Sequence, residues 1–468
     1  MSSEFTGKHV TVAGLGVSGV PAAKVLNGLG AHVTVVNDGD DERARTQAAE
    51  LEALGVTVRL GDGDSLPEGT ELIVTAPGWK PDKPLFTAAA RAGVPVWGDV
   101  ELAWRLRGPD AAPWLAVTGT NGKTTTVQML ASILKAAGLR TAAVGNIGVS
   151  LLDAVTGEEE YDVLAVELSS YQLHWAPSLR AHSAAVLNLA PDHLDWHGSM
   201  EAYAADKGRI YEGNRVACVY NVADKATEDL VRAADVEEGC RAIGFTLGTP
   251  GPSQLGVVEG ILVDRAFVEN RQKNAQELAE VSDVNPPAPH NIANALAAAA
   301  LARAFGVPAS AVRDGLRAFT PDAHRIAHVA DVDGVSYVDD SKATNTHAAE
   351  ASLAAYESIV WIAGGLAKGA TFDELVAGAA KRLRGVVLIG ADRALIREAL
   401  ARHAPEVPVV DLERTDTGAM LQAVQEARRL ARPGDTVLLA PACASMDMFT
   451  NYNKRGDAFA EAVRELGA

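Results

Sequence analysis

The sequence predicts an α/β protein built from three domains of unequal size. Short apolar runs alternate with segments of helical spacing along most of the chain, and many of these runs end in a glycine-rich or polar turn. That alternation is typical of mainly parallel sheets covered by helices. The length, 468 residues, is also more than one hydrophobic core usually supports.

A glycine-rich turn marks the first predicted domain, residues 1–103, as Rossmann-like. A strand leads into Gly14-Leu-Gly16-Val-Ser-Gly19 and an alanine-rich helix, and the acidic residue Asp38 follows about twenty positions later. The turn would present backbone N–H groups to a diphosphate at the helix N-terminus. By itself it does not separate NAD from a UDP group. Strands of this domain are predicted at His9–Ala13, His32–Val36 and Glu71–Thr75.

A second glycine turn opens the central domain, predicted over residues 104–320, after the Pro/Ala-rich linker Arg107–Pro113. In VTGTNGKTTTVQML, residues 117–130, two glycines flank the turn and Lys123 stands at the head of a helix. Glycines let the backbone curl around a phosphate, and the helix N-terminus and the lysine add positive charge. The Thr124 hydroxyl can coordinate Mg²⁺. The loop is a shortened relative of G-x-x-x-x-G-K-[ST], because a valine stands where the first glycine would be. These features predict a P-loop ATPase-like domain.

Polar residues at strand ends extend this candidate site. Glu167 and His193 follow the predicted strands Val163–Val166 and Ala184–Leu189, and ligands gather at the carboxyl ends of strands in such sheets. A carboxylate there is a hard oxygen ligand for Mg²⁺, although strand-end acids are common and a lone histidine is more often structural. Lys207 would ordinarily be a surface lysine. Further β-like runs are predicted at Val216–Tyr220 and Gly256–Val263, and a capped helix is predicted from Pro289.

The third domain, predicted over residues 321–468, is again Rossmann-like. Its strands alternate with helices, and each strand ends in a polar or glycine-rich turn: DDSKATN, AGGLAKG, GAD and APACAS. No tandem repeat of short period is present. Strands are predicted at Val335–Val338, Ile359–Ile362, Val386–Ile389 and Thr436–Leu439.

Composition narrows the class of protein. The net charge is −18 with no basic block, which argues against sequence-independent nucleic-acid binding. No apolar run is long enough to span a membrane, and the N-terminus lacks the apolar core of a signal peptide. Cys218, Cys240 and Cys443 show no metal or disulfide spacing, so each is expected as a small buried hydrophobe in a reducing cytoplasm. We expect a monomer, since three domains can enclose small substrates by themselves.

The two glycine turns favour different functions. The first favours an NAD-dependent dehydrogenase, and the second favours an enzyme that uses a nucleoside triphosphate. A nucleotide-binding regulator without catalysis is a third reading. Both the dehydrogenase and the regulator would leave Lys123, Glu167 and His193 without a shared purpose.

Motifs spread over almost the whole chain resemble the Mur ligase family in order and spacing. They are TGTNGKTTT, GNIG, ELSSYQL, NLAPDHLDWH, YAADKGRIY, HNIANALAA, HR, DDSKATN and PACASMDMF. Within that family, ELSSYQL, DDSKATN, GG-x-x-KG and PACAS resemble the members that add D-glutamate to UDP-N-acetylmuramoyl-L-alanine (UDP-MurNAc-L-Ala) in peptidoglycan precursor synthesis. The resemblance implies that ATP phosphorylates the terminal carboxylate and that the D-glutamate amine attacks the acyl phosphate. It also explains why one chain has two glycine turns, because the first would hold UDP and the second ATP.

The resemblance also implies roles for individual residues, matched position by position. Catalytic roles are implied for Lys123, His193 and Lys207. Two Mg²⁺ sites are implied, one at Thr124 and Glu167 and one at His193 and a carbamylated Lys207. ATP contacts are implied at Gly119, Thr120, Asn121, Gly122, Lys123, Thr124, Thr125, Asn291, Asn294, Arg325 and Asp340. Contacts to the UDP substrate are implied at Gly14, Gly16, Val17, Ser18, Asp38, Gly78 and Asn146, and contacts to D-glutamate at Lys342, Thr344, Lys368, Ser445 and Tyr452.

A few positions depart from the family pattern, and close rivals stay open. Leu366 stands where many members have an acid, Tyr452 stands where Phe is frequent, and Asp38 begins an unusually acidic run. A sister ligase that adds another amino acid and a folate polyglutamate-type ligase are the near alternatives. The N-terminal glycine turn argues against the folate enzyme. DDSKATN argues against the diaminopimelate or lysine adders, whose turn resembles DNPR.

Overall fold

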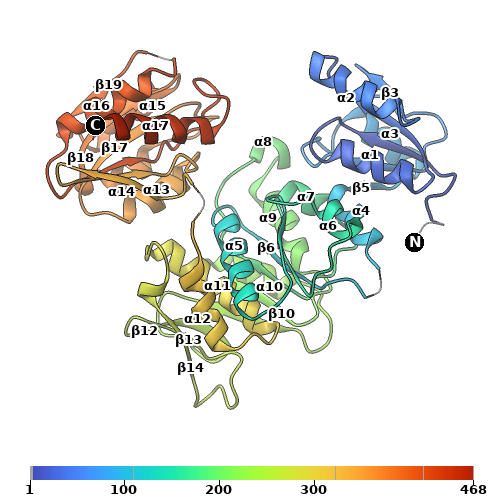
Figure 1. The fold of residues 1–468 in the computed structure, drawn as a ribbon, viewed down its shortest axis with the longest axis horizontal. Coiled ribbons are helices and arrows are strands. Elements are labelled where there is room, and N and C mark those ends of the chain that lie inside the picture. Colours follow the sequence, from blue (N-terminus) through green and yellow to red (C-terminus); the bar gives the residue numbers. More distant parts are fainter. Residues whose placement is uncertain (1–3, 109, 322, 415, 467–468) are drawn as a thin grey trace. The chain divides into compact units, whose positions relative to one another are not determined.

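The computed structural model describes residues 4–108, 110–321, 323–414 and 416–466. The chain divides into two compact units, Met1–Val284 with Asn291–Phe319 and Asn285–His290 with Thr320–Ala468. The first unit holds two β-sheets and the second holds one, each with helices on its faces (Figure 1). Among the residues that the structure describes, no helix is long and apolar enough to cross a membrane.

Five parallel strands form the first sheet, in the order β3-β2-β1-β4-β5. The central strand β1, His9–Ala13, is buried after its first residue, because a parallel sheet is covered on both faces and needs a continuous apolar run. The glycine turn joins β1 to α1, Gly19–Gly28. This doubly wound order confirms the Rossmann-like prediction. The other elements are β2 His32–Asn37, α2 Glu42–Glu52, β3 Thr57–Leu60, β4 Leu72–Thr75, α3 Pro84–Ala92, β5 Val96–Gly98 and α4 Asp99–Leu106.

Nine strands form the second sheet, in the order β14-β13-β12-β11-β10-β9-β6-β8-β7. The seven strands β12, β11, β10, β9, β6, β8 and β7 are parallel to one another. β13 pairs antiparallel with β12, and β14 pairs antiparallel with β13 at the edge of the sheet. The helix α5, Lys123–Ala136, packs its buried face on this sheet, as the apolar spacing after the phosphate loop predicts. The strands are β6 Trp114–Thr118, β7 Ala143–Gly145, β8 Leu164–Glu167, β9 Ser183–Val186, β10 Ala217–Asn221, β11 Arg241–Phe245, β12 Gln254–Val258, β13 Ile261–Asp264 and β14 Gln276–Glu280. The other helices are α6 Leu151–Thr156, α7 Ser170–His174, α8 Leu194–His197, α9 Met200–Gly208, α10 Lys225–Ala233, α11 Pro289–Ala304 and α12 Ala309–Ala318.

Two strand predictions in this sheet need correction. The single run predicted over 256–263 is wrong, because β12 and β13 form a hairpin there. Glu259 and Gly260 have φ of +48° and +80°, the two-residue turn that fits the twist of a hairpin, and apolar residues on both sides hide the reversal in the sequence. The strand predicted over 184–189 ends at Val186 in β9. The Leu187 N–H still bonds to the Thr118 carbonyl of β6 at 3.0 Å, but the Leu189 N–H binds the Asp224 carboxylate at 2.7 Å instead of a strand.

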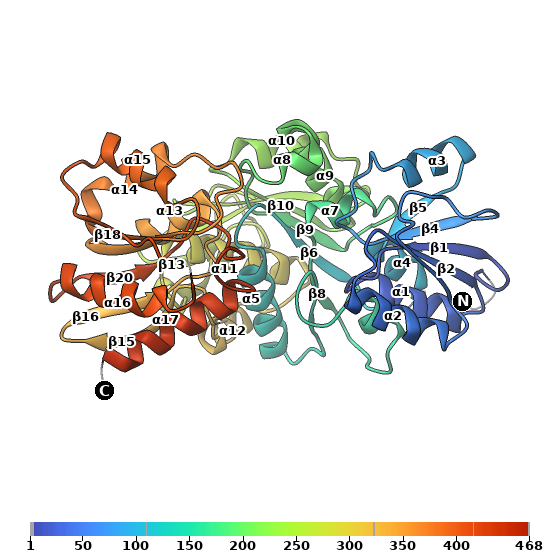
Figure 2. The ribbon, with the colours of Figure 1, turned by 90° about the horizontal axis from the view of Figure 1, so that it is seen from above.

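Six strands form the sheet of the second unit, in the order β15-β16-β20-β17-β18-β19. All neighbours are parallel except β15 and β16, and α16 and α17 lie on the same side of the sheet (Figure 2). The predicted strands are confirmed within two or three residues. The strands are β15 Ala327–Val332, β16 Val335–Asp339, β17 Ile359–Gly364, β18 Leu383–Ile389, β19 Val409–Asp411 and β20 Thr436–Leu439. The helices are α13 Thr346–Ala354, α14 Asp373–Ala379, α15 Arg393–His403, α16 Ala419–Leu430 and α17 Tyr452–Leu466.

We propose that the three sheets correspond to the three predicted domains, 1–103, 104–320 and 321–468. The first of these boundaries falls inside α4. The strand–turn–helix order in each sheet positions the candidate site residues at the carboxyl ends of parallel strands.

Candidate active site

The phosphate loop spans the four residues between β6 and α5. Gly119 and Gly122 have φ of +155° and +83°, where a side chain is strained. A Cβ on Gly122 would also lie 2.4 Å from Oδ1 of Asn294 in α11. The loop therefore needs both glycines, and its curl leaves it at the head of a 14-residue helix, where anions are stabilised.

Lys123 folds back over this loop. Its Nζ donates to the carbonyl oxygens of Gly119 and Thr120, both at 2.9 Å. Asn188, which follows β9, braces the other side: its Oδ1 accepts the Asn121 N–H at 2.8 Å and its Nδ2 donates to the Asn121 carbonyl at 3.1 Å. The sequence prediction missed Asn188, although its place just after a strand is a usable signal.

A buried carboxylate lies at the end of the strand beside the loop. Glu167 ends β8, opposite Val117 of β6, and is 2% exposed. The Asn146 side chain donates to its Oε1 at 2.9 Å, while Oε2 is buried without a hydrogen-bond partner among the described residues. Such an oxygen costs free energy unless a cation or donor meets it. Thr124, a buried residue in the first turn of α5, adds a hydroxyl, and a carboxylate with a hydroxyl is a hard-oxygen donor set that suits Mg²⁺. Within the described ranges, no group of three or more His, Cys, Asp or Glu side chains forms a metal cluster by itself.

Lys207 is the most unusual charge-bearing residue of the site. It lies in α9, is 2% exposed, and its Nζ donates to the Gly119 carbonyl at 2.8 Å, the same oxygen that Lys123 contacts. Burial lowers its pKa well below the usual value, and the charge of Lys123 acts in the same direction. The prediction of a surface lysine from pattern alone is thus wrong, and the structure instead presents a buried amine at the phosphate loop.

His193 lies near enough to Lys123 and Lys207 for their charges to act on it. It lies directly before the short helix α8 with φ of +54°, a left-handed conformation that is uncommon outside glycine. Its ring lies 4.9 Å from the ring of Tyr171. Burial lowers its pKa, and the nearby charges of Lys123 and Lys207 lower it further against the opposing effect of Asp192. A neutral imidazole is the form that can bind a metal ion.

A network that the sequence prediction missed holds α8 and α9 in place. The Asp206 carboxylate bonds to Nδ1 of both His174 and His197, each at 2.9 Å, and His197 Nε2 lies 2.9 Å from Ser170 Oγ. Burial raises the pKa of Asp206, but the hydrogen bonds from the two histidines outweigh it and bring the pKa to about 2. Asp206 precedes Lys207 directly, so this network fixes the turn of α9 that carries the buried amine.

The glycine turn after β1 forms the second predicted nucleotide site. Gly14 has φ of +103°, and a Cβ there would lie 2.9 Å from Trp79 Nε1. Ser18 donates to Asp99 Oδ2 at 3.0 Å, and Val17 is largely exposed, with Gly16 beside it. The backbone is therefore open to a ligand at the head of α1.

Asp38 is exposed and pairs with a lysine, and its predicted contact with the UDP substrate stays a prediction. Its carboxylate accepts from Lys83 Nζ at 2.9 and 3.0 Å, and a Cβ on Gly63 would collide with it. Gly78, another predicted contact, accepts a hydrogen bond from Trp196 Nε1 at 3.1 Å through its carbonyl.

Three turns meet in the second unit and bring the predicted amino-acid contacts together. Lys342 Nζ lies 4.2 Å from the centre of the Tyr452 ring, and Leu366 bridges to Ala444, which places the turn of Lys368 beside that of Ser445. Thr344 follows Lys342 in the same turn, and its N–H bonds to the Lys342 carbonyl at 2.7 Å.

Arg455 of α17, which the sequence prediction missed, joins two of these turns. It is 1% exposed, and it donates to Oγ and O of Ser341 at 3.0 and 2.9 Å and to the Cys443 carbonyl at 3.1 Å. Asp340, next to Ser341, is buried, and burial raises its pKa to about 6. Arg325 also lies in this unit, and its predicted contact with ATP stays a prediction.

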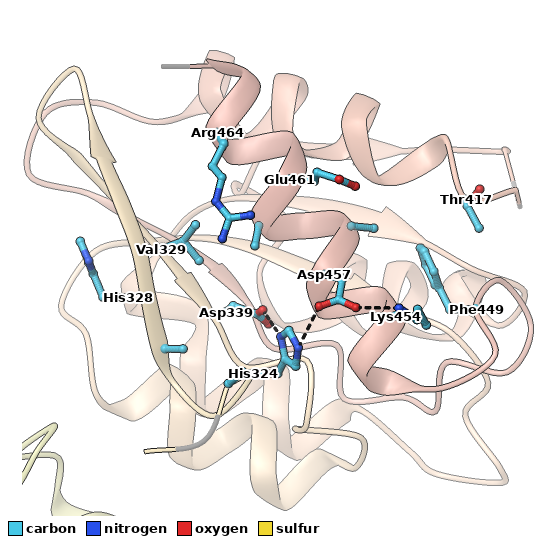
Figure 3. A pocket seen from close by; sticks show the side chains of 14 residues that line it. His324, His328, Val329, Asp339, Thr417, Phe449, Lys454, Asp457, Glu461 and Arg464 are labelled. Atoms are coloured by element: carbon cyan, nitrogen blue, oxygen red, sulfur yellow. Dashed lines mark hydrogen bonds and ion pairs between the residues drawn. The ribbon is translucent and has the colours of Figure 1, made fainter. Parts of the chain in front are cut away.

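A separate cavity of about 660 Å³ opens between β15 and α17 in the second unit (Figure 3). Figure 3 shows His324 between two carboxylates: Nδ1 lies 2.6 Å from Asp339 Oδ2, and Nε2 lies 3.4 Å from Asp457 Oδ1. The Asp339 hydrogen bond raises the pKa of His324 despite burial. None of the predicted contact residues lines this cavity.

Known proteins resemble this chain along its whole length. Residues 117–302 match the Mur ligase middle domain, and residues 324–443 match the Mur ligase, glutamate ligase domain. The UDP-N-acetylmuramoylalanine--D-glutamate ligase of Streptomyces coelicolor is 94% identical over 471 aligned residues, with 100% of both chains covered. The enzyme of the same name from Thermobifida fusca is 60% identical, with 99% of both covered. The solved MurF ligase of Thermotoga maritima, in complex with ADP, has a TM-score of 0.57 at 16% identity and covers 99% of this chain and 97% of its own, a likeness of fold.

Proposed function

The chain belongs to the Mur ligase family, and we propose that it is an ATP-dependent ligase that joins D-glutamate to UDP-MurNAc-L-Ala. The step belongs to peptidoglycan precursor synthesis, and we assign it to the cytoplasm. The observation that carries the proposal is the phosphate loop itself. The curled glycine turn, Lys123 and the buried residues Glu167 and Lys207 lie at one edge of the second sheet, in a chain 94% identical to a named D-glutamate ligase.

The reaction has two parts. A carboxylate oxygen of UDP-MurNAc-L-Ala attacks the γ-phosphorus of ATP, and ADP leaves. The D-glutamate nitrogen then attacks the acyl carbon, a tetrahedral intermediate forms, and it collapses to the amide with loss of phosphate and a proton. Loop N–H groups and Lys123 would stabilise the charge that shifts onto the phosphate oxygens during transfer.

Mg²⁺ fits the donor set of this site. Thr124 and Glu167 would hold one ion, because Glu167 has a buried carboxylate oxygen that no described group satisfies. His193 and a carbamylated Lys207 would hold a second. When bound, the ions would neutralise the phosphate oxygens so that two anionic reactants can meet.

The burial of Lys207 supports the proposal that it is carbamylated. A neutral amine adds to CO₂ and gives a carbamate and a proton, whereas an ammonium cannot. The lowered pKa of Lys207 favours the neutral amine, and the carbamate would replace a repelling cation by an anionic ligand. The Asp206 network would hold that ligand in position.

The other predicted contact residues are assigned to the three substrates as the sequence implies. Gly14, Gly16, Val17, Ser18, Asp38, Gly78 and Asn146 are assigned to the UDP substrate. The residues from Gly119 to Thr125, which form the phosphate loop and the start of α5, are assigned to ATP together with Asn291, Asn294, Arg325 and Asp340. Lys342, Thr344, Lys368, Ser445 and Tyr452 are assigned to D-glutamate, whose two carboxylates need cationic or N–H-rich partners.

The test is phosphate release from ATP with Mg²⁺ and UDP-MurNAc-L-Ala over a panel of D- and L-amino acids. Release with D-glutamate alone would support acceptor, donor and reaction class together. Release with another amino acid instead would support the ligase reaction but contradict the assignment of D-glutamate as the acceptor. No release with any acceptor would overturn the proposal and leave the glycine turns as nucleotide-binding elements.

A further inference from the structure

Two of the three cysteines lie side by side in the central sheet. The Sγ atoms of Cys218 and Cys240 are 3.9 Å apart, although the residues are 22 positions apart in the sequence. Cys218 lies on β10 and is 2% exposed, while Cys240 directly precedes β11 and is half-buried. β10 and β11 are parallel neighbours, with Ala217 opposite Arg241, so the register brings the two thiols to one place. The proposed ligase reaction uses neither.

We propose that Cys218 and Cys240 are a site of reversible oxidation, which closes to an intrachain disulfide when the protein meets a hydroperoxide. The third cysteine, Cys443, lies in the second unit and does not take part.

Closing the disulfide requires one of the two cysteines to move, and the structure indicates which one can. A disulfide has its sulfurs about 2.0 Å apart, so the two Sγ atoms must approach by about 1.9 Å. Cys218 is held in the strand ladder on both sides by β9 and β11. Cys240 instead ends an exposed turn in which its N–H bonds to the Glu237 carbonyl at 3.0 Å. The preceding Gly239 has φ of +91° and open space around it, so Cys240 is the residue that can move.

The environment also distinguishes the two sulfurs. The contact between the two sulfurs lowers the pKa of Cys240 and raises that of Cys218. Burial further raises the pKa of Cys218. Thiolates, not thiols, react with peroxides, so the more accessible Cys240 is the attacking group.

The chemistry balances with hydrogen peroxide as the oxidant. The Cys240 thiolate attacks one peroxide oxygen, the O–O bond breaks, and the departing hydroxide takes up a proton as water, leaving a sulfenic acid on Cys240. The Cys218 sulfur then attacks the Cys240 sulfur, the S–O bond breaks, and the Cys218 proton leaves with the hydroxide as a second water. Two thiols and one peroxide give one disulfide and two waters. Because Cys218 adjoins the sulfenic acid, it would intercept that acid before further oxidation.

The experiment treats the folded, full-length chain with hydrogen peroxide, quenches it in acid and denaturant, alkylates the remaining thiols and measures the intact mass. We expect one alkylated thiol, Cys443, with a disulfide peptide that joins Cys218 to Cys240, and three alkylated thiols after dithiothreitol.

Cys240→Ser should abolish the disulfide, and it is preferred to a change at Cys218 because a half-buried serine should not disturb the fold. The matched control Cys443→Ser should keep the disulfide and leave no thiol to alkylate. Three alkylated thiols after peroxide, a sulfinic acid at Cys240 as the main product, or a disulfide to Cys443 or between chains would overturn the proposal.

Discussion

Replacing Lys123 by alanine should remove most turnover and leave the fold intact. The side chain closes the phosphate loop through the carbonyls of Gly119 and Thr120, both at 2.9 Å, and it would be the cation nearest to the transferred phosphate. Alanine at the first position of α5 keeps a good helix former there. It also removes a positive charge from a helix N-terminus, where cations are mildly unfavourable, so the thermal midpoint should change little.

The size of the effect follows from the charge that is lost. Two unit charges about 4 Å apart interact by about 4 kcal/mol at an effective dielectric constant of 20. Loss of that interaction in the transition state lowers kcat/KM by about a thousandfold, and kcat falls to the extent that the interaction is weaker in the ground state.

The assay is phosphate release with ATP, Mg²⁺, UDP-MurNAc-L-Ala and D-glutamate, together with thermal unfolding of each variant. Lys135→Ala is the matched control, since Lys135 is an exposed lysine in the last turn of the same helix. Kinetics for Lys123→Ala equal to those of the control would refute the role of Lys123 at the phosphate. A large fall in the thermal midpoint would instead show that the lysine holds the loop together.

Three further predictions follow from single side chains. Lys207→Ala should lose activity. Small carboxylic acids such as acetate should restore part of that activity by occupying the position of the proposed carbamate. Full activity without added acid would make Lys207 a structural residue. Asp339 raises the pKa of His324, so this contact stabilises the fold fully below the ordinary histidine pKa of about 6.5 and loses its effect as pH rises through the raised value. Thermal unfolding over about pH 6 to 8 should therefore depend less on pH in His324→Gln, and an unchanged pH dependence would contradict this reasoning. Tyr452→Phe should hardly change KM for D-glutamate because it keeps the ring over Lys342. Tyr452→Ala should raise KM roughly 2- to 30-fold, the equivalent of about 0.5–2 kcal/mol of cation–π energy. Equal KM values in the two variants would exclude a role for this contact in D-glutamate binding.

Local features of this protein were readable from the sequence alone. The strand, glycine turn and helix around Lys123 lie within a short segment, and their conformations follow from backbone sterics and hydrophobic spacing. The place of Glu167 could also be predicted, because the carboxyl ends of parallel strands share one edge of a sheet. The motif order further indicated the family, which the relatives then confirmed.

Contacts between distant segments were decided only by the tertiary structure. Lys207 is typical of a surface lysine in its helix, yet α9 packs it against Gly119, and burial together with the charge of Lys123 lowers its pKa well below the usual value. Arg455 and the Asp206 network carry no sequence signal, because their partners lie in other turns of the fold. The cysteine pair shows the reason most directly: which residues meet across two parallel strands depends on strand order and register, and neither is encoded in the spacing of the residues along the chain.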